Sequence, residues 1–165
     1  IDEGAAGTGY ASGLPEDLEA LLPAGGALLH LSAEGGADIL AFDMYVQVPE
    51  PVTLSAPATG LFESVSTSSP LEVSWNQGTG DMILVTFTPL SATFQLIAGV
   101  GLVCQQEGDL GSLSIPETAL KAVKNSGVSK VAIGVTRMRT STTNAGDWLV
   151  PAAVTRSSGG LLGLD

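Results

Sequence analysis

The sequence predicts an all-β protein: an antiparallel immunoglobulin-like or fibronectin-III-like β-sandwich with one or two short helices. Apolar and polar residues alternate in short runs, as in Leu71–Trp75, which is the period of a strand buried on one face. Turn residues separate about eight to ten such runs at intervals of roughly 8–14 residues, a spacing typical of sandwiches.

The segment from Leu71 to Leu90 is the centre of this prediction. A strand that ends at Trp75 is followed by Asn-Gln-Gly-Thr-Gly-Asp, in which glycine permits the positive φ of a tight turn. The run from Met82 to Phe87 is almost continuously apolar, as expected of a central strand covered on both faces. We therefore expect a two-strand unit with the Trp75 indole as its buried anchor.

Three segments are predicted: an N-terminal arm with a short helix (1–26), the β-sandwich (27–156) and a flexible Gly-rich C-terminal tail (157–165). Within them we expect helices at 14–22 and 116–123, because proline and acidic residues favour helix starts. We also expect a polar loop at 140–146 and a last strand at 148–155. The residues expected in the core or at its border are Phe42, Val73, Trp75, Val85, Phe87, Ile133 and Trp148.

Charge is distributed unevenly along the 165 residues, whose formal net charge is −11. Residues 1–120 contain fifteen Asp or Glu and no Lys or Arg, whereas residues 121–165 contain all six basic residues. An acidic protein of this kind is a poor partner for nucleic acid or anionic membranes. No apolar run reaches the roughly 18–20 residues of a membrane span.

Candidate catalytic groups are few, and we predict no catalytic residue and no cofactor. His30 is the one histidine, and neither a nucleophile-elbow nor a zinc-protease motif accompanies it, so we interpret it as a strand histidine on a polar face. Cys104 is the one cysteine, and we expect a buried free thiol, with an intermolecular disulfide as the alternative.

Two sets of charged residues are candidate binding groups. Asp81, Glu107 and Asp109 lie in predicted turns and are weak candidates for calcium ligands, although their spacing matches no EF-hand loop. Arg137 and Arg139 share one side of a predicted strand, and that side is also the apolar one. Either a bulge near Thr136 switches faces or the strand outlasts the core. The two arginines are then either solvated or a patch for a carboxylate-bearing partner.

Four further segments join the central unit in a resemblance to a known family. They are the strand of Cys104, the turn GDLGSLSIPETAL, a valine-rich strand and the motif GDWLV. Together with LEVSWNQGTGDMILVTF they resemble uncharacterised secreted proteins of myxobacteria and related bacteria, which are often lipoproteins. The resemblance covers roughly 27–154 and implies an immunoglobulin-like or fibronectin-III-like sandwich outside the cell or at its surface. It implies no reaction.

The sequence therefore predicts a non-catalytic extracytoplasmic β-sandwich module with a binding or structural role, extracellular or at the cell surface. Its partner would be a protein or a surface polymer. One alternative is a subunit that self-assembles head to tail into a filament or surface layer, with residues 1–13 or 157–165 donated to a neighbouring copy. The other is a hydrolase that depends on carboxylates or calcium.

Overall fold

The computed structural model describes residues 2–3, 10–11, 24–37, 39–61, 63–91, 93–97 and 101–165. The helix predicted at 14–22 and most of the predicted N-terminal arm lie outside these residues. The described strands are β1 (Asp2–Glu3), β2 (Tyr10–Ala11), β3 (Leu28–Ala33), β4 (Phe42–Gln47), β5 (Leu54–Ala56), β6 (Ser64–Val65), β7 (Leu71–Trp75), β8 (Met82–Leu90), β9 (Leu102–Glu107), β10 (Ser112–Ile115), β11 (Lys130–Ala145) and β12 (Trp148–Leu164), with helix α2 (Glu117–Asn125) between β10 and β11.

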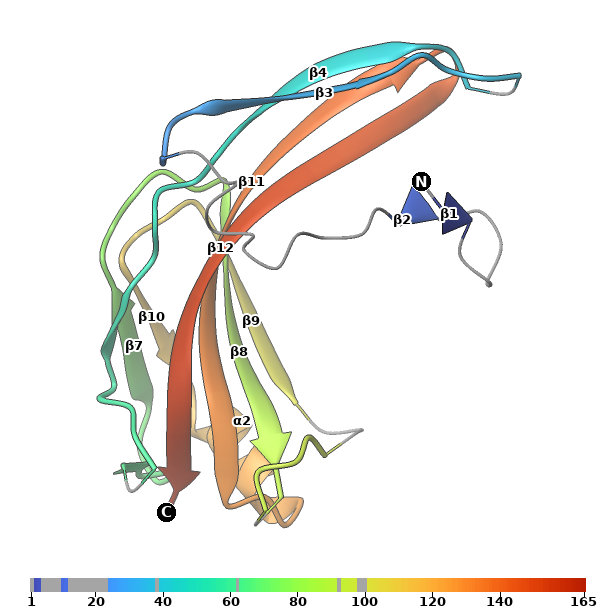
Figure 1. Cartoon of the computed structure of the whole chain (residues 1–165). Coiled ribbons are helices and arrows are strands. Elements are labelled where there is room, and N and C mark those ends of the chain that lie inside the picture. Colours follow the sequence, from blue (N-terminus) through green and yellow to red (C-terminus); the bar gives the residue numbers. More distant parts are fainter. Residues whose placement is uncertain are drawn as a thin grey trace.

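Two packed sheets form the body of the molecule, and the all-β antiparallel prediction is confirmed. A five-stranded sheet in the order β6-β12-β11-β8-β9 faces a three-stranded sheet in the order β10-β7-β5 (Figure 1). All strand pairs in these sheets are antiparallel except β6 with β12. The predicted anchor Trp75 is buried between the sheets, together with Val73, Val85, Phe87 and Ile133.

Helix α2 confirms the second predicted helix. Pro116 is its N-cap residue, Glu117 lies in its first turn and Lys124 in its last, as the helix dipole favours. Leu120 and Val123 face the core. No helix in the described part of the chain has the length and apolar character of a membrane span.

The long hairpin of β11 and β12 extends beyond the sandwich as a curved arm (Figure 1). Its pairing with β8 ends at Met138, whereas its two strands stay paired up to Ala145 and Trp148. The β3–β4 hairpin packs on this extension and buries Met44 and Val46 there, outside the main core cluster. We call the extension with β3 and β4 the arm.

Three expectations for the C-terminal third are wrong. Residues 140–146 are strand and a tight turn rather than a loop, because threonine fits a strand and Gly146, with a φ of 70°, closes a two-residue turn. Residues 157–165 are no flexible tail: they complete β12, and Leu162 and Leu164 are buried in the core. Trp148 lies at the tip of the arm and is 58% exposed. Of the other core residues, Phe42 is half-buried.

Candidate functional site

Arg137 was predicted as a partner-binding residue, and this is wrong because its side chain is fully buried. No bulge precedes it: β11 keeps one register with β8 from Lys130 to Met138, so Arg137 stays on the apolar side of the strand at the end of the core. Its Nε donates to Asp109 Oδ2 at 2.6 Å, and its Nη1 donates to the carbonyls of Glu50 and Pro51 at 2.8 and 2.9 Å. Its Nη2 donates to the carbonyl of Asn76.

The carboxylate of Asp109 joins Arg137 to the indole of Trp75. Trp75 Nε1 donates to Asp109 Oδ1 at 2.7 Å, and the amide of Gly78 donates to Oδ2 at 3.1 Å. A Cβ at Gly78 would lie 2.6 Å from Arg137 Cζ, so glycine lets this turn close over the guanidinium. The network therefore ties the loops before β5 and after β7 to the end of the sandwich where the arm begins.

Arg139 lies at the same junction and is also paired. Its Nη1 donates to Asp81 Oδ1 at 2.7 Å, and its Nη2 donates to Gln47 Oε1 at the end of β4. The backbone N–H of Thr140, at 2.7 Å from Oδ2, is the main cause of a lowered pKa at Asp81, and Arg139 lowers that pKa further. Because its side chain is 26% exposed, the partner role predicted for Arg139 stays a prediction.

The calcium candidates do not form a common site. Asp109 uses both oxygens within the protein, Asp81 is engaged by Arg139 and Thr140, and Glu107 is exposed at the end of β9. Among the described residues, no group of three or more His, Cys, Asp or Glu side chains is arranged to hold a metal ion.

His30 and Cys104 lie in different parts of the molecule. His30, on β3 of the arm, is about half exposed, bonds to Asp43 and stacks on Tyr45 at 4.7 Å between ring centroids. Cys104, on β9, is half-buried against the core, and desolvation raises the pKa of its thiol. A raised pKa disfavours the thiolate that a nucleophile needs.

The second face of the five-stranded sheet is the most extended candidate surface. The β3–β4 hairpin and the three-stranded sheet both lie on the convex side of β11 and β12, so the concave side of the curve faces away from them (Figure 1). Strand alternation assigns the side chains of this surface, which we call the concave face. They are Met82, Leu84, Thr86 and Thr88 of β8, Val103, Gln105 and Glu107 of β9, Ala132, Gly134, Thr136, Met138, Thr140, Thr142 and Asn144 of β11, and Leu149, Pro151, Ala153, Thr155, Ser157, Gly159 and Leu161 of β12.

Hydroxyl, amide and aliphatic side chains dominate the concave face, and they are exposed or half-buried. Val103 is 67% exposed and Leu149 is 65% exposed. Lys130 begins β11 at one end of the face, with its ammonium 4.2 Å from the centre of the Phe94 ring. Glu107 lies at the β9 edge, level with Met82 and Met138 in the middle of the face, and the Asp81 carboxylate accepts a hydrogen bond from the Thr140 hydroxyl. The strip of β11 and β12 beyond Lys130 carries no charged side chain on this face, although the chain has a net charge of −11.

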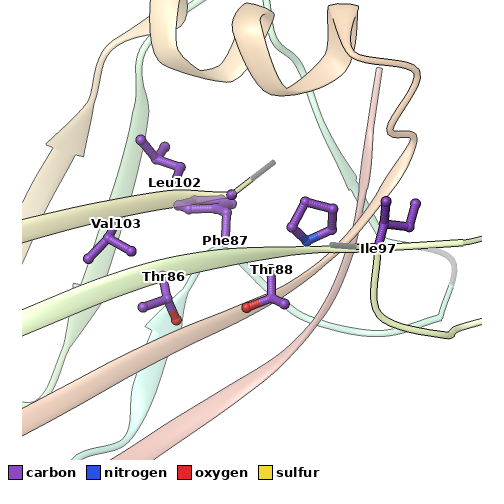
Figure 2. A pocket seen from close by; sticks show the side chains of 8 residues that line it. Thr86, Phe87, Thr88, Ile97, Leu102 and Val103 are labelled. Carbon is purple, nitrogen blue, oxygen red and sulfur yellow. The ribbon is translucent and has the colours of Figure 1, made fainter. Parts of the chain in front are cut away.

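A shallow pocket of about 300 Å³ opens on the β8–β9 part of this surface. Thr86, Thr88 and Val103 point to the side of the sheet away from helix α2, and Phe87 and Leu102 point toward the helix (Figure 2). A second pocket of about 330 Å³ lies near the end of β12 and includes Lys130 and Leu161. The concave face therefore has an uncharged strip along β11 and β12, with a hollow on each side of the end where β11 begins.

Sequence reasoning missed the concave face as a site. The alternation of Val131, Ile133 and Val135 with Ala132, Gly134 and Thr136 was visible, and it identified the polar side of the strand. It did not indicate that four neighbouring strands line up such sides, or that β11 and β12 carry no charged side chain there beyond Lys130.

Comparison of the chain with models of protein families, with curated proteins and with solved structures found no match. The resemblance to secreted myxobacterial proteins therefore stays a prediction.

Proposed function

We propose that this chain is a non-catalytic extracytoplasmic β-sandwich module that binds a partner at the cell surface through its concave face. The observation that carries the proposal is the uncharged strip of β11 and β12 on that face in a chain of net charge −11. Acidic side chains elsewhere keep such a protein soluble, whereas an uncharged extended surface can be desolvated on binding at little electrostatic cost.

The placement of the reactive groups supports a binding role over a catalytic one. Asp109 is committed to Arg137 and Trp75, and Asp81 is committed to the arm junction. Cys104 and His30 belong to different layers, so they do not form a nucleophile–base pair. A carboxylate-dependent hydrolase stays an untested alternative.

The strand order supports an immunoglobulin-like or fibronectin-III-like topology as part of this proposal. Strands β5, β7 and β10 would correspond to A, B and E of such sandwiches, and β9, β8, β11 and β12 to C′, C, F and G. The arm is then a long extension of the F–G hairpin. Binding modules of this architecture often bind through the loops at the end of the sandwich where the F–G hairpin lies. This comparison is an analogy of fold alone.

Self-assembly into a filament or surface layer remains the other prediction. Two of the observations that favoured it in the sequence, the free arginines and the free C-terminal segment, are absent from the described structure. Arg137 and Arg139 are paired with acidic residues of the same chain, and residues 157–164 already complete a strand of their own sheet. The acidic and basic parts of the sequence thus interleave in the fold.

The test is binding of the fluorescently labelled protein to washed cells of the strain that encodes it. Thr155→Arg places a charge in the middle of the concave face at an exposed position, and Thr118→Arg makes the same change on the exposed side of helix α2. We expect saturable binding that Thr155→Arg weakens at least about tenfold, since it buries an unpaired charge, whereas Thr118→Arg leaves it unchanged. Absence of saturable binding, or equal binding by both variants, contradicts the proposal.

A further inference from the structure

We infer that the ligand of the concave face is a neutral polysaccharide that lies along its strands. This inference rests on the proposed function, because it names the partner class of the same surface. Three properties of the face lead to it: its hydrogen-bonding side chains, the uncharged strip of β11 and β12, and the lack of aromatic rings among its side chains.

Hydroxyl groups gather in the middle of the face, on three neighbouring strands. Thr136 and Ser157 lie in register on β11 and β12, and their hydroxyl oxygens are 2.8 Å apart. A Cβ at Gly134 would lie only 2.9 Å from Thr86 Oγ1, so glycine leaves room for the β8 hydroxyl beside this pair. The hydroxyls of Thr86, Thr136 and Ser157 therefore form a cluster around Gly134, which has no side chain.

Further hydroxyls continue along the same surface. In the described part of the chain, Thr88, Thr142 and Thr155 have no hydrogen-bond partner for their Oγ1 atoms. A hydroxyl both donates and accepts, which matches the hydroxyls of a sugar polymer. Met138 and Leu84 lie between these groups and offer aliphatic contacts to sugar C–H groups.

Electrostatics restrict the partner to a neutral molecule. An anionic polymer is repelled by the net charge of −11, and a cationic one would gather on the acidic surfaces rather than here. Lys130 begins the face, and Glu107 and Asp81 lie beside its middle, so the part without a charge for either kind to pair with is the strip of β11 and β12 beyond Lys130.

Side-chain composition disfavours a protein or a lipid surface as the occupant. Cores of protein interfaces are enriched in Tyr, Trp, Phe, Met and Arg, and energetic hot spots in Trp, Tyr and Arg. Of these types the described concave face carries Met82 and Met138 alone, so it has none of the hot-spot residues. Membrane surfaces are bound by basic residues beside aromatic or leucine-rich faces. Neither pattern is present among these side chains.

Because the face is long, the dependence of affinity on oligosaccharide length is the most informative measurement. From Ala132 to Asn144 the strip extends for about 40 Å at roughly 3.3 Å per residue, which exceeds a single sugar many times over. Each hydrogen bond to a neutral hydroxyl contributes little, so affinity should accumulate with the number of sugars. We expect binding to polymers and long oligosaccharides and none to monosaccharides.

The experiment uses the whole chain with three neutral polymers, namely amorphous cellulose, chitin and a β-1,3-glucan, and with alginate as the acidic control. Pull-down identifies the polymer, and calorimetry with its oligosaccharides of two to eight sugars gives the dependence on length. We expect saturable binding to at least one neutral polymer, no binding to alginate, and affinity that rises with oligosaccharide length.

Paired variants locate the site. Thr86→Val with Thr136→Val keeps side-chain shape and removes two hydroxyls, so affinity should fall by roughly three- to tenfold for each. Thr86→Ser with Thr136→Ser restores the hydroxyls and should recover most of it. Ser114→Ala, on the exposed outer side of β10, is the control and should leave binding unchanged. Melting temperatures within a few degrees of the parent establish that the variants are folded.

The outcomes separate this inference from the proposed function. If cell binding is weakened by Thr155→Arg while all three neutral polymers neither bind nor compete, the inference is overturned and the surface still binds a partner. Loss of that cell binding after protease treatment of the cells assigns the face to a protein, which also overturns it. Polymer binding that the valine pair does not weaken overturns the location. Failure of all cell binding contradicts the proposed function itself.

Discussion

At the scale of single residues, Arg137 shows how a charge is accommodated in a small core. Each of its three guanidinium nitrogens donates a hydrogen bond, and one partner is the carboxylate of Asp109. Such a pair is weak evidence for net stability, because removing two charges from water costs several kcal/mol each. The pair instead fixes the positions of three loops, because the acceptors lie before β5, after β7 and between β9 and β10.

Replacing Arg137 by methionine should be strongly destabilising. The change leaves the Asp109 carboxylate buried without its cation, which typically costs roughly 3–5 kcal/mol of unfolding free energy. The matched control is Lys121→Met, which removes an exposed lysine 3.3 Å from Glu117 on helix α2 and should cost at most about 0.5 kcal/mol. Urea denaturation at pH 7 measures both. Equal losses for the two variants would show that Arg137 is not buried as described.

At the scale of elements, β12 carries two kinds of side chain on its two faces. Leu162 is 2% exposed and belongs to the core cluster, whereas its neighbour Leu161 is half-buried and lies on the concave face. The strand ends the chain, yet its last residues pair with β11 on one side and β6 on the other. A segment rich in glycine and serine thus forms a strand that is paired on both sides in the five-stranded sheet.

The pair Leu162→Ala and Leu161→Ala should have unequal effects on stability. Leu162→Ala leaves a cavity in the core and should cost roughly 2–5 kcal/mol. Leu161→Ala removes a partly exposed side chain and should cost about 1 kcal/mol. Thermal and urea unfolding of both variants provide the comparison. If residues 157–165 were a flexible tail, both substitutions would be nearly neutral.

At the scale of the whole molecule, the sandwich and the arm share two strands but have separate apolar clusters. The main cluster lies between the two sheets, and Met44, Val46 and Ala145 are buried outside it. Beyond Met138 the arm consists of two two-stranded ribbons packed on each other. Such ribbons are marginally stable unless they pack, so the arm depends on this small second core.

We predict that the arm opens at a lower free energy than the sandwich. Native-state hydrogen exchange should give stronger protection to the amides of 131–137 than to those of 140–145, a comparison within one strand. Met44→Ala should lower protection in the arm and leave residues 131–137 nearly unchanged, because Met44 lies outside the main cluster. Uniform protection along β11 would instead indicate a single cooperative unit.

Local patterns in the sequence determined the elements that depend on near neighbours. Alternation identified the strand of Trp75 and the strand of Ile133, and proline with an acidic first turn identified helix α2. These features depend on residues a few positions apart, where side-chain direction follows from backbone geometry. The same patterns correctly placed most of the predicted core.

Contacts between distant segments decided the rest. The partners of Arg137 are 28 to 87 positions away, so its burial, and that of Asp109, was not readable from the strand that carries it. The ends of β11 and β12 looked like loop and tail because their threonines and glycines lack apolar alternation. Antiparallel pairing of each end with the start of the other strand makes them strand, and the β3–β4 hairpin packs on the end of β11. The concave face exists for the same reason: a strand has two sides by its own geometry, but the other layers determine which side stays open.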